Sequence, residues 1–75
     1  MGVRELQVSL GKRCRDLRRK RGFSQVDMAK KFAFSLSHYQ KIERGALDPR
    51  LTTLHRLAEC FEVSLSELLR GVLHR

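Results

Sequence analysis

The chain has 75 residues, and its 16 lysines and arginines against 8 acidic residues give a formal net charge of +8. This length predicts a single domain, and so positive a charge favours a polyanionic partner, most often nucleic acid. The sequence shows no apolar stretch of membrane-spanning length and no signal-peptide pattern, so we expect a cytoplasmic protein without membrane contact. No catalytic or metal-ligand constellation is recognisable in it. We therefore expect no enzyme, no cofactor, no metal site and no small-molecule ligand.

An apolar stripe predicts a first helix over roughly residues 3 to 20. Its members recur at steps of three and four: Val3, Leu6, Leu10, Cys14 and Leu17. Basic residues occupy the other faces, and Gly22 suits the left-handed position that ends a helix. Cys14 and Cys60 both lie in helical patterns. We expect them as buried free thiols, with a disulfide as the alternative.

Two short helices are predicted between Ser24 and Gly45. Ser24 is a suitable N-cap for the first, which runs to about Phe32. After a short turn, Ser35 caps the second, which ends at Arg44 before a glycine. Such a pair is typical of a helix-turn-helix, whose second helix enters the major groove of DNA.

Two further helices complete an all-α domain. A turn at Asp48-Pro49 precedes a helix that begins near Leu51. The sequence from Ser64 to Glu67 matches a complete capping box, which predicts the start of the last helix. Its apolar side is formed by Leu65, Leu68, Leu69, Val72 and Leu73.

A set of residues in order resembles the phage Cro and repressor type of helix-turn-helix regulators, the XRE family. The set covers about residues 10 to 70 and comprises Ser24-Gln25, Ala29, Ser35, Ile42-Glu43-Arg44-Gly45, Pro49, Leu54, Leu57-Ala58, Val63-Ser64-Leu65 and Glu67-Leu68. The resemblance implies a compact five-helix, lambda-repressor-like domain over residues 1–75, with a core of about 8–70. It also implies a homodimer that binds double-stranded DNA on a palindromic site and represses transcription. Two positions depart from the family: Ala33, where glycine is frequent, and Tyr39, where an aliphatic residue is usual.

Base readout is expected from the outward side of the second helix of the pair. Ser37 can bond several base edges, Gln40 can pair with adenine, and Lys41 can donate to guanine. Leu36 could contact a thymine methyl group. The resemblance implies that Leu36, Ser37 and Lys41 occupy the most direct reading positions, with Gln40 next. The alternative for each is an ordinary surface residue.

Phosphate contacts are expected near helix N-termini and from basic side chains beside them. The resemblance implies that Gln25 grips a backbone phosphate and braces the reading helix. The complete expected set is Ser24, Gln25, His38, Arg44 and Arg50. The first helix also offers Lys12, Arg13 and Arg19, among which charge alone does not choose.

Two groups of residues are expected in structural roles. The resemblance implies an ion pair between Arg18 and Glu43, with two solvated charges as the alternative. Leu69, Val72 and Leu73 are expected in an isologous dimer interface, unless they only pack on the first helix.

Two other functions of such a domain remain open at this stage. One is an antitoxin-like or other protein-interaction module with DNA binding secondary. The other is RNA binding, which the small number of aromatic residues disfavours.

Overall fold

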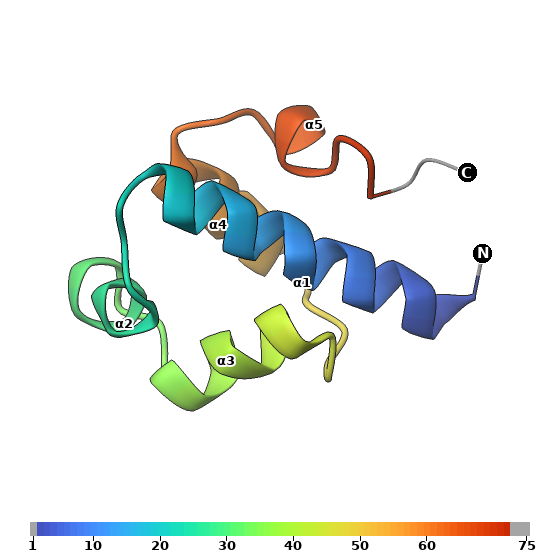
Figure 1. The fold of residues 1–75 in the computed structure, drawn as a ribbon, viewed down its shortest axis with the longest axis horizontal. Coiled ribbons are helices and arrows are strands. Elements are labelled where there is room, and N and C mark those ends of the chain that lie inside the picture. Colours follow the sequence, from blue (N-terminus) through green and yellow to red (C-terminus); the bar gives the residue numbers. More distant parts are fainter. Residues whose placement is uncertain (1, 73–75) are drawn as a thin grey trace.

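The computed structural model describes residues 2–72, and these residues form five helices and no strand. The all-α prediction is thus confirmed, as is the order of the elements (Figure 1). The helices are α1 (Val3–Lys20), α2 (Gln25–Phe32), α3 (Leu36–Arg44), α4 (Leu51–Phe61) and α5 (Leu65–Leu68). No helix within this part of the chain is long and apolar enough to cross a membrane.

The long helix α1 is the centre of the fold, with α3 along one side and α5 on the other (Figure 1). Two glycines allow α3 to lie directly on α1. A Cβ atom at Gly11 would lie 2.4 Å from the carbonyl oxygen of Glu43, and one at Gly45 would lie 2.8 Å from the Cα atom of Val8. Because real Cβ atoms do not approach so closely, the two backbones can meet only where side chains are missing.

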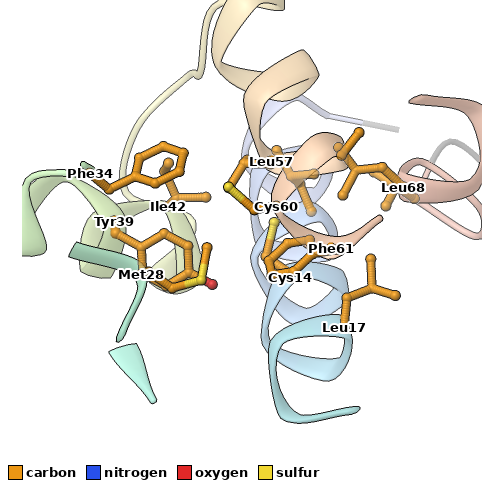
Figure 2. Close-up of a cluster of buried hydrophobic side chains, with 13 residues drawn as sticks. Cys14, Leu17, Met28, Phe34, Tyr39, Ile42, Leu57, Cys60, Phe61 and Leu68 are labelled. Atoms are coloured by element: carbon orange, nitrogen blue, oxygen red, sulfur yellow. The ribbon is translucent and has the colours of Figure 1, made fainter. Parts of the chain in front are cut away.

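The hydrophobic core joins all five helices. Figure 2 shows Met28, Tyr39 and Ile42 of the α2–α3 pair on one side, facing Cys14 of α1 and Phe61 of α4 on the other. Each of these side chains is at most 1% exposed. A domain this small has a thin margin of stability, so the position of α3 depends on a few well-packed residues.

Both cysteines are buried free thiols, which confirms the prediction for them. Burial is the main cause that raises the pKa of Cys14 to about 12 and that of Cys60 to about 11. Neither group is therefore a thiolate at neutral pH, and both act as small apolar core residues.

The turn between α2 and α3 is left-handed at an alanine. Ala33 has φ 60° and ψ 29°, a conformation that costs a residue with a side chain about 1 kcal/mol. The next residue fixes this turn, because Phe34 is buried, its ring lies 5.8 Å from that of Tyr39, and the Arg56 guanidinium lies 4.2 Å above it. The packing of Phe34 therefore offsets the cost of alanine in place of glycine, and Ala33 keeps the left-handed conformation of this turn.

The last helix is shorter than the sequence pattern suggests, because α5 ends at Leu68 and only turns follow to residue 72. Beyond that end, Gly71 adopts a left-handed conformation with φ 79°, so the chain does not return to a helical path there. The capping box is also incomplete. Ser64 accepts a hydrogen bond from the backbone N–H of Glu67, but the Glu67 carboxylate turns to Arg13 instead of to the backbone of Ser64.

Candidate nucleic-acid interface

Helices α2 and α3 form the predicted helix-turn-helix, and their ends follow local chemistry. Ser24 and Asp27 complete a reciprocal capping box at the start of α2. Ser35 accepts from the backbone N–H of His38 at the start of α3, and the left-handed Gly45 ends that helix. These caps fix where α3 begins and ends, and so which of its side chains face outward.

The outer side of α3 carries the side chains expected to read DNA. Ser37, Lys41 and Arg44 are exposed, and Leu36 and Gln40 are half-buried. The inner side carries Tyr39, Ile42 and Glu43, all of which are buried. The helix therefore has one side that packs on the core and one polar and basic side that is free to meet a partner.

A buried ion pair joins α1 to α3. Arg18 donates from Nε to Glu43 Oε2 at 2.6 Å and from a terminal nitrogen to Oε1 at 3.1 Å. Its other terminal nitrogen donates to the carbonyl oxygen of Phe23 at 2.9 Å. Arg18 is 8% exposed and Glu43 is 3% exposed. One guanidinium thus connects α1, α3 and the loop that leads into α2, with the bidentate geometry that suits a carboxylate.

Tyr39 adds a further donor to the same carboxylate. Its ring packs in the core, and its hydroxyl donates to Glu43 Oε2. Tyr39 is thus a core residue, and its hydroxyl lies inside the molecule. Burial is the main cause that raises the pKa of Tyr39 far above its usual range, so this hydroxyl remains a donor.

Glu43 remains ionised in spite of its burial. Removal from water by itself would raise the pKa of this carboxyl. The hydrogen bonds from Arg18, Tyr39 and Gln25 together outweigh that effect and hold the pKa below its usual value. The acid in this segment is therefore a fully bonded internal group, and it presents no carboxylate to an approaching phosphate.

Gln25 and Gln40 extend the network to the surface of the helix pair. Gln25 donates from Nε2 to Glu43 Oε1 at 3.0 Å, and its own Oε1 accepts from Nε2 of Gln40 at 3.3 Å. The bracing role that the resemblance implied for Gln25 has a direct geometric basis here. The bond between the two glutamines was not foreseen, because sequence spacing does not show which side chains meet between two helices.

The N-terminus of α4 presents a second polar region beside α3. Arg50 precedes this helix, and no side chain within residues 2–72 caps the free N–H groups of its first turn. A surface hollow here is lined by His38 of α3, by Arg50 and Thr52 at the start of α4 and by Arg56 further along it, with the acidic Asp48 also in its wall. Free helix N–H groups with basic side chains around them are suited to a phosphate.

The basic residues of α1 have different surroundings, which charge alone could not show. Arg13 donates to the carbonyl oxygens of Glu67 and Leu68 and to the Glu67 carboxylate, so it holds α5 and is not available to DNA. Arg15, which was not among the expected site residues, lies with its Nε 3.8 Å from Glu43 Oε1 and is about half exposed. Its position three residues before Arg18 on the same helix face is the signal that could have found it.

Of the residues expected in a dimer interface, Leu69 and Val72 line the same small apolar groove. Val72 is 2% exposed and packs in the core of the single chain, and its place at an interface stays a prediction. Leu69 is half-buried and Leu73 lies outside the described residues. Leu69 lines a small apolar groove with Val3 and Leu6 of α1, Pro49 and Leu54.

Comparison with known proteins identifies the family. Residues 15–68 match the model of the helix-turn-helix family, so the chain belongs to that family. The Cro and repressor type inferred from the residue pattern is thereby confirmed. Members of this kind are regulators and not enzymes, which also confirms that expectation.

Three curated relatives have similar sequences. The chain is 35% identical over 65 residues to the HTH-type transcriptional regulator DdrOP3 of Deinococcus deserti, covering 87% of this chain and 50% of the relative. It is 36% identical over 62 residues to the HTH-type transcriptional regulator ImmR of Bacillus subtilis, covering 83% and 49%. It thus spans about half the length of both. An uncharacterised HTH-type transcriptional regulator of Sinorhizobium fredii, y4dJ, is 33% identical over 65 residues, covering 87% and 84%.

A solved structure shares the fold. The restriction-modification controller protein C.AhdI from Aeromonas hydrophila superimposes with a TM-score of 0.77 at 31% identity. The match covers 83% of this chain and 94% of that one. The fold of this chain is therefore shared with a restriction-modification controller protein.

Proposed function

We propose that the chain is a sequence-specific DNA-binding transcriptional regulator that inserts α3 into the major groove. The observation that carries the proposal is the two-sided nature of α3. Glu43, on its inner side, is fixed by a buried carboxylate network, while its outer side presents Ser37 and Lys41 to solvent. A reading helix needs both features, because base edges are recognised by side chains held in a defined position.

Base readout is assigned to the outer side of α3. Ser37 can bond to several base edges and Lys41 can donate to guanine O6 and N7. Leu36, half-buried on the same helix, is assigned a contact with a thymine methyl group. Gln40 has a hydrogen-bond partner inside the protein, Gln25.

Phosphate contacts are assigned to groups on both sides of α3. On the α2 side, Gln25 keeps one free N–H after its bond to Glu43, and the exposed Ser24 lies beside it. On the α4 side, His38 and Arg50 surround the free N–H groups of the helix start. Arg44, exposed at the end of α3, completes the set. These contacts position the helix and carry no base information themselves.

We further propose that two copies bind a palindromic site and repress transcription by excluding other proteins from it. The apolar groove next to Leu69 is the surface assigned to the second copy, because Val3 on its rim is 68% exposed. A two-fold dimer would place two copies of α3 about 34 Å apart, one turn of DNA. The site of action would be the cytoplasm, where such a regulator meets its DNA.

Selection of bound sequences from random duplex DNA at several salt concentrations tests this function. The expected result is one palindromic motif with half-site centres about ten base pairs apart and an affinity that falls steeply with salt. Binding without any base preference would contradict a specific regulator.

The dimer surface has a separate test by sedimentation. Val3→Glu is expected to shift the protein to monomer by placing a charge on the groove. The matched control is Val26→Glu on α2, another exposed valine outside the groove. A wild-type chain that stays monomeric at high concentration would remove this part of the proposal.

A further inference from the structure

The hydrogen bonds around Glu43 have a fixed direction. An ionised carboxylate only accepts, and Glu43 receives two bonds from Arg18, one from Tyr39 and one from Gln25. These four donors match the number of lone-pair sites that a carboxylate offers. Glu43 therefore sets the orientation of every amide that reaches it.

The donors that Glu43 requires also determine how the side-chain amides of Gln25 and Gln40 are oriented. Because Gln25 must turn its NH2 group to Glu43, its Oε1 has to face Gln40, and Gln40 must in turn present its own NH2 group. The amide of Gln25 is thus held at both ends, with one N–H left over. With the bond to Glu43 alone, the Gln25 amide could still swing about that bond and turn its remaining N–H away from a phosphate.

We propose that Gln40 is a positioning residue for Gln25 and not a reader of bases. This inference rests on the proposed function, since it concerns the same DNA-binding surface. Gln40 donates to Gln25 Oε1 and so keeps the remaining N–H of Gln25 turned toward the DNA backbone. The interaction acts on a phosphate contact, so it contributes to affinity on every sequence alike.

The test uses Gln40→Met, which keeps the length of the side chain and removes its donor, and Gln40→Leu, which also removes the donor and likewise adds no charge. Affinity is measured by fluorescence anisotropy on a duplex with the selected site and on an unrelated duplex, at one salt concentration. Both variants are expected to lose affinity for both duplexes by a similar factor, about two- to tenfold for one hydrogen bond. The base preferences obtained by repeated selection are expected to remain those of the wild-type protein.

A double-mutant cycle with Gln25→Met distinguishes a Gln40 that positions Gln25 from a Gln40 that contacts DNA by itself. If Gln40 acts through Gln25, Gln40→Met has no further effect on affinity once Gln25 is replaced. Ser37→Ala serves as the matched control for a reader on the same helix, and it is expected to change the preference at one base pair. Urea unfolding of each variant checks that the fold is retained.

A readout without DNA completes the experiment. In the wild-type protein the side-chain amide of Gln25 is held by two partners, and Gln40→Met is expected to shift its NMR signals. Unchanged Gln25 signals, or a change of preference at a single base pair in Gln40→Met, would overturn the positioning role. A wild-type chain that binds no duplex would instead refute the proposed function, and the NMR readout would still decide whether Gln40 holds Gln25.

Discussion

Replacement of Arg18 by methionine tests how the position of α3 is held. The change keeps most of the apolar stem and removes the guanidinium that donates twice to Glu43 and once to the carbonyl oxygen of Phe23. Removal of one partner of a buried ion pair costs about 3–5 kcal/mol, because the other charge is left buried. Tyr39 and Gln25 still donate to Glu43, so we expect about 3 kcal/mol.

This loss is large for so small a domain. Proteins of this length have a free energy of unfolding of roughly 4–11 kcal/mol. Urea unfolding followed by circular dichroism should therefore show a much lower midpoint for Arg18→Met. Arg19→Met, at the exposed neighbouring position, is the matched control and should change the free energy of unfolding by no more than about 0.5 kcal/mol.

The pH dependence of the stability difference between the wild-type protein and Arg18→Met identifies the buried charge that causes it. The pKa of Glu43 is below its ordinary value near 4.5 in the folded wild-type protein. A carboxyl whose folded pKa is lowered stabilises above its unfolded pKa, and this contribution is lost as the pH falls through the folded pKa. In Arg18→Met the lowering is diminished or reversed. The difference between the two proteins should therefore be full at neutral pH, begin to shrink as the pH falls through the pKa of Glu43 in the variant, and continue to shrink below about pH 4.5.

Two results would refute this reasoning. One is an Arg18→Met variant that unfolds like Arg19→Met and loses only DNA affinity, which would make Arg18 a DNA contact. The other is a stability difference that does not change on acidification, which would exclude Glu43 as the buried charge.

Four other substitutions give clear expectations. Gly11→Ala should lower the free energy of unfolding by about 2 kcal/mol or more, measured in urea, because its Cβ would lie 2.4 Å from the Glu43 carbonyl oxygen; an unchanged midpoint would contradict direct contact of α1 and α3. Ala33→Gly should raise the thermal midpoint slightly, by relief of up to about 1 kcal/mol of left-handed strain, and a lower midpoint would argue against that strain. Lys41→Ala should change the base preferred at one position of the selected motif. Arg50→Ala should keep the motif and reduce the slope of log affinity against log salt concentration by about one. The reverse result would make Lys41 a phosphate contact and Arg50 a reader of bases.

The helix boundaries could be predicted because they depend on neighbouring residues in the chain. Ser24 and Ser35 cap helices locally, and Gly45 ends one by its left-handed conformation, so sequence alone was sufficient. The end of α5 was missed. An apolar pattern continued past Gly71, and its left-handed conformation had not been considered.

The polar contacts between helices were harder to predict. The pairing of Arg18 with Glu43 was suggested by family resemblance, but nothing in the sequence showed that Gln40 would bond Gln25 or that Arg13 would hold α5. Such bonds depend on rotamers and on helix crossing geometry. Apolar periodicity likewise predicts that a side chain is buried but not which surface covers it. For this reason Val72 was assigned to a dimer interface, whereas its side chain packs in the core of the single chain.

Amide chemical-shift mapping tests most directly whether the outer side of α3 meets DNA. The wild-type protein is titrated with the duplex obtained by selection, and its backbone and side-chain amide signals are followed. We expect the largest shifts at Ser37 and Lys41, at the Gln25 side chain and at the first turn of α4, with little change in α5. Shifts concentrated in the groove between Val3 and Leu69, with α3 unaffected, would contradict this expectation.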